Sequence, residues 1–177
     1  IDQRAPGTLV TEVVSEDSST ARYELVSQMR ASIYLLGPLL AKRGHAKISL
    51  PGGCVIGLRP VDLHIKGMRA LGATIRLEHG YIIADAPEGG RLRGAQVSLR
   101  GPMGSSVGAT CNTLMAACLA DGETIIDDAA YEPEIGELAR FLIRMGAIIK
   151  GIDTPQLVIT GVPALGGANC VVPPDRI

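Results

Sequence analysis

Apolar side chains recur along this chain at helical and at strand-like spacing, and the two patterns alternate. The helical spacing predicts helices over residues 21–43, 61–71, 107–120 and 134–145. Short apolar runs bounded by turn residues predict strands over 47–50, 74–77, 81–84, 96–99, 124–127, 147–150 and 156–160. Helices that alternate with strands indicate a mixed α/β fold.

A glycine follows each predicted helix, which is typical of a helix C-terminus because glycine adopts left-handed backbone angles without steric cost. These glycines are Gly44, Gly72, Gly122 and Gly146. The helix predicted over 21–43 also contains Gly37 and Pro38. Proline removes a backbone donor, so we expect a kink or an interruption at this pair.

The order of the elements repeats once, roughly over 21–100 and 101–177. In each part a helix, a strand, a second helix and two further strands follow one another. The residues match too, since LGATI at 71–75 corresponds to MGAII at 145–149. This period is too long for the common solenoid repeats, so it indicates two copies of one unit packed about a pseudo-symmetry axis.

One segment, LPGGCVIGLRP at 50–60, breaks the match between the copies. Pro60 lies 16 positions after Gly44, whereas Pro133 lies 11 positions after Gly122, so the first copy carries about five extra residues. Glycine and proline predict a surface loop here. A thiol on such a loop beside a cation can be reactive, which makes Cys54 next to Arg59 a candidate site.

The composition excludes several classes of protein. Hydrophobic residues make up 46% of the 177 residues and the net charge is −1, which fits a globular chain and gives no basic surface for nucleic acid. No apolar run reaches the length of a membrane span, and no signal peptide is apparent. No cluster has metal-ligand spacing, and the four scattered cysteines fit the reducing cytosol.

Several motifs, in order from about residue 30 to the C-terminus, together resemble the UDP-N-acetylglucosamine 1-carboxyvinyltransferases, a family of enolpyruvyl transferases. They are MRASI at 29–33, SLPGGC at 49–54, GLRPVDLH at 57–64, LGA at 71–73, SVGAT at 106–110, EPEI at 132–135 and PDRI at 174–177. The resemblance implies a two-lobe enzyme without a cofactor. Each lobe is then a barrel-like arrangement of repeated α/β units, with helices inside and sheets outside.

The resemblance also implies that residues 1–177 form part of one lobe, with the partner lobe absent. The first 20 residues show no pattern typical of a domain start, which agrees with a piece of a longer chain. The family's lysine–asparagine pair, and its aspartate and arginine from the other lobe, have no counterpart here. We therefore expect the isolated chain to be inactive or nearly so.

By the resemblance, Cys54 is the general acid and can form a covalent adduct with phosphoenolpyruvate, while Arg59 and Arg30 contact substrate. The UDP-sugar contacts are Pro60, Val61, Asp62 and Leu63. Each assignment has a plain structural alternative: Cys54 as a small buried residue, Arg59 in a surface salt bridge, and Arg30 as a solvated helix charge. Asp62 could instead cap its helix, and His64 could be purely structural.

A second substrate segment begins the helix predicted from residue 107. Its free backbone amides can hold a diphosphate. This segment consists of Ser105, Ser106, Val107 and Gly108. The family often has a lysine where this chain has Gly104, so the contact is left to the backbone and the hydroxyls.

The implied reaction transfers the enolpyruvyl group of phosphoenolpyruvate to the 3'-hydroxyl of UDP-N-acetylglucosamine and releases phosphate. This is a cytoplasmic step that opens peptidoglycan synthesis and is inhibited by fosfomycin. A shikimate-pathway enolpyruvyl transferase shares the fold, but the Gly-Gly-Cys loop argues against it. A non-catalytic module that binds a nucleotide sugar is the alternative from another class.

Overall fold

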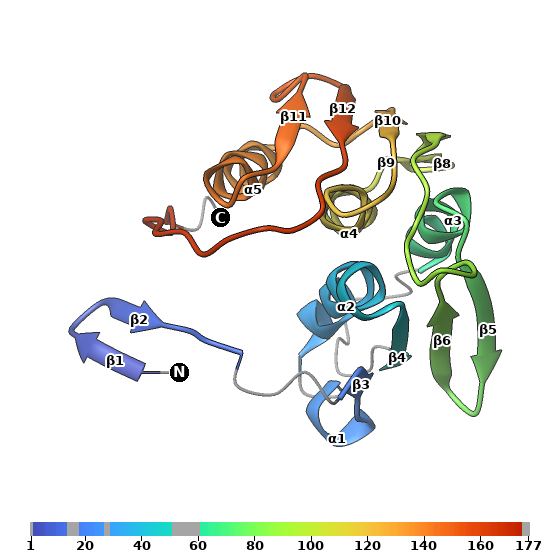
Figure 1. Ribbon diagram of the computed structural model, residues 1–177, viewed down its shortest axis with the longest axis horizontal. Helices are drawn as coiled ribbons and strands as arrows, with labels where there is room; N and C mark the ends of the chain where they lie inside the picture. The colour runs from blue at the N-terminus through green and yellow to red at the C-terminus, as the bar shows by residue number, and fades with distance from the viewer. Residues whose placement is uncertain (1, 14–17, 27–28, 51–60, 175–177) are drawn as a thin grey trace.

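The computed structural model describes residues 2–13, 18–26, 29–50 and 61–174. Its body consists of two four-stranded sheets with helices packed between them (Figure 1). The predicted mixed α/β fold with inner helices and outer sheets is confirmed. Among the described strands, neither sheet closes into a barrel.

The first sheet has the strand order β3-β4-β6-β5, in which only β3 and β4 run parallel. Its strands are β3 (Thr20–Ala21), β4 (His45–Ser49), β5 (Thr74–Glu78) and β6 (Tyr81–Asp85). The helices α2 (Leu36–Arg43) and α3 (Asp62–Ala70) alternate with them along the chain. The parallel pair is joined through helices, as parallel strands require.

The second sheet has the order β11-β12-β10-β7, and again only one pair, β7 with β10, runs parallel. Its strands are β7 (Gln96–Ser98), β10 (Glu123–Asp127), β11 (Ile148–Lys150) and β12 (Gln156–Thr160). The helices are α4 (Val107–Ala117) and α5 (Pro133–Arg144). Read from β7, this sheet has the same order and strand directions as the first sheet.

The prediction of one helix over 21–43, kinked or interrupted only at Gly37 and Pro38, is wrong. The chain forms a short helix α1 (Tyr23–Val26), a 3-10 helix η1 (Arg30–Leu35) and then α2. The expected interruption at Gly37 and Pro38 is also wrong, because both residues lie in the first turn of α2. The first backbone N–H groups of a helix have no partner inside it, so proline costs little there.

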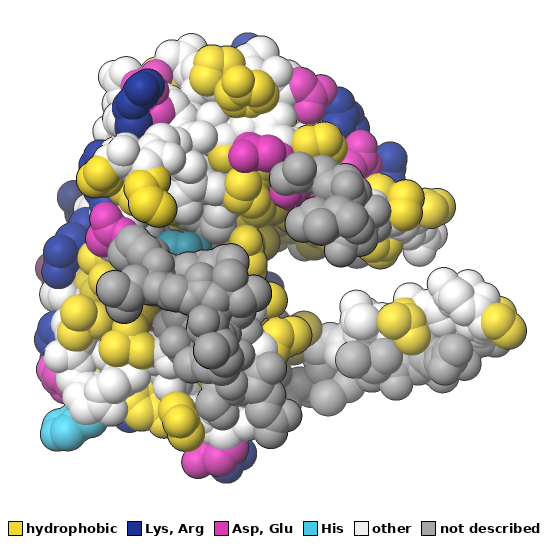
Figure 2. All heavy atoms as spheres, turned by 180° about the vertical axis from the view of Figure 1, so that it is seen from behind, with side chains coloured by type: hydrophobic (Ala, Val, Ile, Leu, Met, Phe, Trp, Pro, Cys, Tyr) yellow, Lys and Arg dark blue, Asp and Glu magenta, His cyan; other side chains and the backbone are white. Residues whose placement is uncertain are grey.

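Two hairpins complete the described chain, and neither was predicted. The hairpin of β1 (Asp2–Ala5) and β2 (Thr8–Val10) stands apart from the body (Figures 1 and 2). The hairpin of β8 (Arg100–Gly101) and β9 (Gly104–Ser105) leads into α4. Its two-residue strands are too short to give an alternating pattern of apolar residues.

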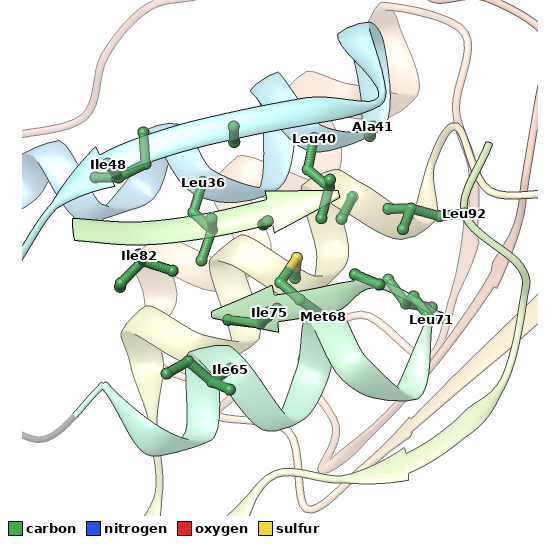
Figure 3. Close-up of a cluster of buried hydrophobic side chains, with 14 of the residues drawn as sticks. Leu36, Leu40, Ala41, Ile48, Ile65, Met68, Leu71, Ile75, Ile82 and Leu92 are labelled. Carbon is green, nitrogen blue, oxygen red and sulfur yellow. The ribbon is translucent and has the colours of Figure 1, made fainter. Parts of the chain in front are cut away.

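The interior contains two clusters of buried apolar side chains, one beside each sheet, and α4 contributes to both. In the first cluster, Leu36 and Leu40 of α2 and Met68 of α3 pack against the inward side chains of the first sheet (Figure 3). From α4, Ala116 belongs to this cluster and Leu114 belongs to the other. A helix that is covered on opposite sides has no polar face, which explains its small and apolar sequence.

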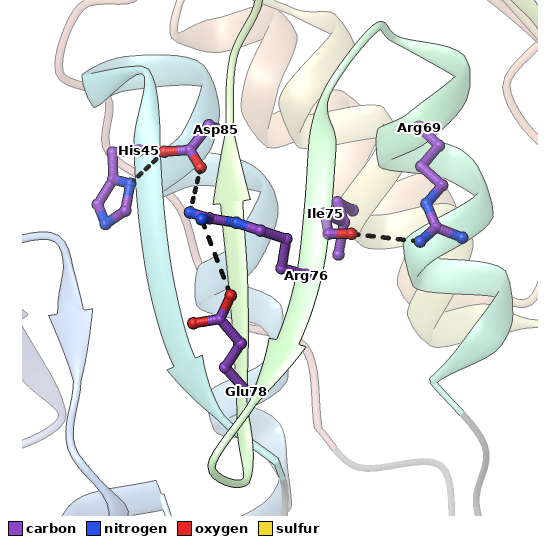
Figure 4. A network of polar contacts seen from close by, with 6 residues as sticks. All are labelled: His45, Arg69, Ile75, Arg76, Glu78 and Asp85. Atoms are coloured by element: carbon purple, nitrogen blue, oxygen red, sulfur yellow. Dashed lines mark hydrogen bonds and ion pairs between the residues drawn. The ribbon is translucent and has the colours of Figure 1, made fainter.

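The outer face of the first sheet is polar (Figure 4). Asp85 lies 2.7 Å from His45 and 3.1 Å from Arg76, and Arg76 also lies 3.8 Å from Glu78. These contacts are exposed, and each contributes little to the stability of the fold because solvent screens the charges. On the view from behind, acidic and basic side chains alternate around the rim (Figure 2), in keeping with the net charge of −1. Within the described residues, no helix is long and apolar enough to cross a membrane.

Candidate functional site

The amino ends of α3 and α4 lie side by side, and each carries residues predicted to contact substrate. A Cβ atom added to Gly108 would lie 3.0 Å from both Cε1 and Nε2 of His64. A Cβ added to Gly101 in the β8–β9 hairpin would lie 3.1 Å from Cδ1 of Leu63. Helix α3, helix α4 and the hairpin therefore converge, and they bring the segments 61–63 and 105–108 together.

Other predicted site residues lie outside the described part of the chain. They are Cys54, Arg59, Pro60 and the side chain of Arg30, whose backbone begins η1. Twelve residues separate β4 from α3, whereas five separate β10 from α5 in the second unit. The difference between these two connections is larger than the five extra residues expected from the sequence, because α3 begins at Asp62 rather than at Pro60.

The start of α4 has the features of a helix N-terminus. Ser106 is the N-cap, and its hydroxyl oxygen accepts a hydrogen bond from the N–H of Ala109 at 3.2 Å. The first bond of the helical ladder runs from the N–H of Thr110 to the carbonyl oxygen of Ser106 at 2.9 Å. The amides of Val107 and Gly108 precede this ladder, so they can donate to an anion.

The start of α3 is built differently. Val61 is its N-cap and makes no side-chain capping bond, and Asp62 is the exposed first residue of the helix. The alternative that Asp62 serves as the N-cap is therefore wrong. Its carboxylate still interacts favourably with the positive end of the helix dipole.

A surface pocket of about 260 Å³ adjoins the start of α4, and the sequence reasoning missed it. Its lining residues are Arg100, Gly104, Ser105, Asp128, Ala129, Tyr131 and Pro155. Asp128 accepts hydrogen bonds from the Ser98 hydroxyl at 2.8 Å and from the Arg100 guanidinium at 3.3 Å. Arg100 is paired with Ser105 across the hairpin, so a cation lies beside the predicted substrate segment 105–108. The turn residues 101–104 are the signal that could have located this hairpin.

His64 is buried, and its Nδ1 lies 2.8 Å from Nδ2 of Asn112 on α4. This contact gives His64 the structural role that was left open. Its other ring edge packs against Gly108, in the segment predicted to contact substrate. Asn112 was not predicted as a site residue. A single asparagine inside an apolar helix pattern is the signal that could have identified it, because a buried amide needs partners.

Two of the four cysteines are buried and unreactive. Burial raises the pKa of the Cys118 thiol from 9.0 to about 12. Burial also raises the pKa of Cys111 to about 12, with a smaller contribution from the Glu134 carboxylate. Cys170 is exposed on the C-terminal segment. In the described part of the chain, no group of three or more His, Cys, Asp or Glu side chains is arranged to hold a metal ion.

The two buried thiols predict a loss of stability at alkaline pH. Above pH 9 they ionise in the unfolded chain but stay protonated in the folded one, so their stabilising contribution is complete below about pH 9 and falls toward pH 12. Each thiol then costs up to about 1.4 kcal/mol per pH unit. Urea unfolding at about pH 8 and pH 10 measures this, and the Cys111→Ala, Cys118→Ala double variant should show a smaller difference between the two pH values. An unchanged difference would contradict the assignment.

Comparison of the sequence and the structure with known proteins identifies the family and the fold of this chain. The family model described as EPSP synthase (3-phosphoshikimate 1-carboxyvinyltransferase) matches residues 4–177. The chain belongs to the EPSP synthase family. Among solved structures of this fold, the enolpyruvyl transferase NikO from Streptomyces tendae superposes with a TM-score of 0.67 at 23% sequence identity. The match covers 81% of this chain and 33% of NikO.

Two curated relatives of this chain carry the name UDP-N-acetylglucosamine 1-carboxyvinyltransferase. The protein from Rhodospirillum centenum is 58% identical over 160 residues, which cover 90% of this chain and 36% of the relative. The protein named UDP-N-acetylglucosamine 1-carboxyvinyltransferase 2 from Carboxydothermus hydrogenoformans is 56% identical over 171 residues. These cover 97% of this chain and 39% of the relative. The chain thus spans somewhat more than a third of the length of these relatives.

Proposed function

We propose that this chain is part of an enzyme that transfers the enolpyruvyl group of phosphoenolpyruvate to the 3'-hydroxyl of UDP-N-acetylglucosamine. The observation that carries this proposal is the 56–58% identity, over at least 90% of the chain, to relatives named for that activity. The enzyme would act in the cytoplasm and begin peptidoglycan synthesis. Residues 1–177 would form part of the lobe that carries the cysteine loop, with two internal repeats.

The proposed chemistry is an addition followed by an elimination. A general acid protonates the methylene carbon C3 of phosphoenolpyruvate, and the sugar hydroxyl adds to C2 and gives up its proton. The resulting intermediate carries both the sugar oxygen and the phosphate on C2. Loss of one of the three protons of the C3 methyl group then restores the double bond as phosphate leaves, so the number of protons on C3 is unchanged overall. Cys54 is the acid in this proposal, because a positioned thiol can deliver a proton to a reacting carbon.

Binding of two anionic substrates requires donors and cations, and the convergence of α3, α4 and the hairpin supports such a role. We assign the diphosphate to the amides of Val107 and Gly108 together with the hydroxyls of Ser105 and Ser106. Residues 60–63 would hold the nucleoside part of the UDP-sugar. Arg30 and Arg59 would pair with phosphate or carboxylate oxygens, since a guanidinium matches both.

The choice of acceptor tests this function. In a hybrid enzyme, this chain replaces the matching segment of the R. centenum relative, and phosphate release is measured with UDP-N-acetylglucosamine or with 3-phosphoshikimate. We expect turnover with the UDP-sugar alone; turnover with 3-phosphoshikimate would favour the shikimate-pathway reaction. Binding of the UDP-sugar without phosphate release would favour a non-catalytic module. The isolated chain should show little or no turnover, because groups from another lobe are needed to orient the substrates.

Arg100 should contribute to the affinity for the UDP-sugar, because it supplies the cation beside Ser105. Arg100→Ala in the hybrid should raise KM for UDP-N-acetylglucosamine about 10-fold, the order expected for one hydrogen bond to a charged group. Arg76 offers a matched control, since it is also exposed and paired with an aspartate, Asp85, but on the outer sheet face. Equal KM values for Arg100→Ala and Arg76→Ala would contradict this role.

A further inference from the structure

The loop that follows β10 places an aspartate, Asp128, in the pocket beside Ser105. Strands β7 and β10 are the parallel pair of the second sheet, and their register sets Ser98 opposite Asp127. The chain therefore leaves both strands at the same edge of the sheet, toward Arg100 from β7 and toward Asp128 from β10. Loops that follow the carboxyl ends of parallel strands often carry functional groups, because they meet at one edge.

The backbone around Asp128 is fixed by two other parts of the fold. The N–H of Ala129 donates to the carbonyl oxygen of Pro155, in the β11–β12 connection, at 2.9 Å. The N–H of Ala130 donates to the hydroxyl of Thr110 in α4 at 3.0 Å. Asp128 itself has a φ angle of +51°, which aspartate tolerates better than most residues with a Cβ atom. The carboxylate is therefore attached to a backbone that is held in place.

Two donors orient this carboxylate. The Ser98 hydroxyl donates to Oδ2 of Asp128 at 2.8 Å, and Nη1 of Arg100 donates to Oδ1 at 3.3 Å. The backbone N–H of Arg100 donates in turn to Oγ of Ser98 at 3.3 Å. Ser98 thus fixes the rotation of the carboxylate, and the carboxylate fixes the guanidinium.

Arg100 depends on this aspartate for its position. Its side chain is 72% exposed, and within the described residues Asp128 is the hydrogen-bond partner of its guanidinium. A long exposed side chain samples many rotamers, and a ligand that binds it must first order them. The bond to Asp128 restricts the rotamers in advance. It engages Nη1, so the donors on Nη2 and Nε remain for a ligand.

The Arg100 side chain lies on the pocket side of the β8–β9 hairpin. Arg100 and Ser105 are opposite residues of its two strands, so their side chains share one face. Both residues line the pocket of about 260 Å³, together with Asp128. A diphosphate held by Ser105 and the amides that begin α4 would therefore lie beside the remaining donors of the guanidinium.

Resting on the proposed function, we propose that Asp128 is a positioning residue for Arg100. It holds the guanidinium in the pocket beside Ser105, where the donors on Nη2 and Nε bind the diphosphate of the UDP-sugar. Asp128 itself does not contact the substrate. Its effect on affinity passes entirely through Arg100, which distinguishes positioning from a direct or a merely structural role.

Two substitutions of Asp128 in the hybrid enzyme test this proposal. Asp128→Gly removes the carboxylate and keeps the backbone, since glycine adopts a positive φ freely. KM for UDP-N-acetylglucosamine should rise about 3- to 10-fold, while kcat changes less. Asp128→Asn keeps an acceptor for Arg100 and also tolerates this φ, so it should recover most of the affinity. An unchanged KM for Asp128→Gly would overturn the proposal, and so would a lower one, which would mean that the carboxylate mainly repels the diphosphate.

Asp153→Gly is the matched control. Asp153 also has a positive φ, 63°, and also pairs with an arginine, Arg140. It does not line the pocket, so KM should not change. An equal rise in KM for Asp153→Gly and Asp128→Gly would show that glycine acts through the fold at large, which would overturn the role of Asp128.

The decisive measurement is a double-mutant cycle on KM with Asp128→Gly and Arg100→Ala. If Asp128 acts through Arg100, the double variant has the same KM as Arg100→Ala alone. Independent, multiplying increases in KM would overturn the proposal. If the native hybrid binds UDP-N-acetylglucosamine without turnover, the proposed function fails, and the same cycle on Kd, measured by calorimetry, still decides the role of Asp128. Absence of binding to the native hybrid would overturn both.

Discussion

Replacing Cys54 with alanine in the hybrid enzyme should lower kcat for enolpyruvyl transfer by about 10²- to 10⁴-fold, the usual contribution of a general acid. Without a proton at C3, the C2 centre does not become electrophilic enough for attack by the sugar hydroxyl. Cys54→Asp should keep part of the rate, because a carboxylic acid can also deliver a proton. The measurement is phosphate release at saturating concentrations of both substrates.

Cys170→Ala is the matched control for this result. Cys170 is exposed, and its removal leaves the proposed site intact, so kcat should not change. Full activity of Cys54→Ala would show that another group delivers the proton. A large loss in Cys170→Ala would mean that the effect of cysteine removal is not specific to the loop.

Replacing Gly37 with alanine should lower the free energy of unfolding by about 3 kcal/mol, at the upper end of the usual cost of overpacking. A Cβ on Gly37 would overlap the backbone carbonyl oxygen of Asn112 and approach Oδ1 at 2.9 Å. Helices α2 and α4 would have to separate, because the obstacle is the backbone. The hydrogen bond from Gly37 to Asn112 would weaken at the same time.

Gly136→Ala in α5 is the control for this prediction. A Cβ there would meet the ends of the Asp153 and Arg140 side chains, which can move away. Alanine also favours the helix over glycine by about 1 kcal/mol, so stability should change little. Urea unfolding of the two variants in parallel measures the difference, and equal losses would contradict the account of the α2–α4 contact.

Local chemistry was sufficient to predict where most helices end. Gly44, Gly72, Gly122 and Gly146 all have positive φ angles, between 69° and 104°, at the positions expected of them. Glycine is required there by backbone geometry alone, so the residue type itself carries the information. The apolar spacing located α3, α5 and the strands of both sheets except β3, because each has one buried side. Strand β3 was missed, since Thr20–Ala21 lies at the start of the helix predicted over 21–43.

Tertiary contacts explain the errors. Helix α4 ends at Ala117 rather than at residue 120, and both Ala116 and Ala120 are buried, so the apolar pattern continues past the helix. The break in the first predicted helix falls before Arg30 rather than at Pro38. Apolar periodicity does not distinguish a first turn from an interior turn, whereas proline tolerance depends on that difference.

The candidate site was predictable to the extent that it depends on short motifs. The segments 61–63 and 105–108 are separated by about 40 residues, and their side-by-side placement follows from packing of α3 against α4. The pocket with Arg100 and Asp128, and the bond between His64 and Asn112, join residues 28 and 48 positions apart. No local pattern encodes such pairs, so they emerged only from the folded chain.

The most direct test of the central claim is the mass of the product that the hybrid enzyme forms from phosphoenolpyruvate and UDP-N-acetylglucosamine in D₂O. Addition and elimination pass through a methyl group formed with a solvent proton. The account therefore predicts UDP-N-acetylglucosamine that has gained one enolpyruvyl group, with deuterium on its methylene carbon. Unmodified UDP-sugar, or an enolpyruvyl product without deuterium, would contradict it.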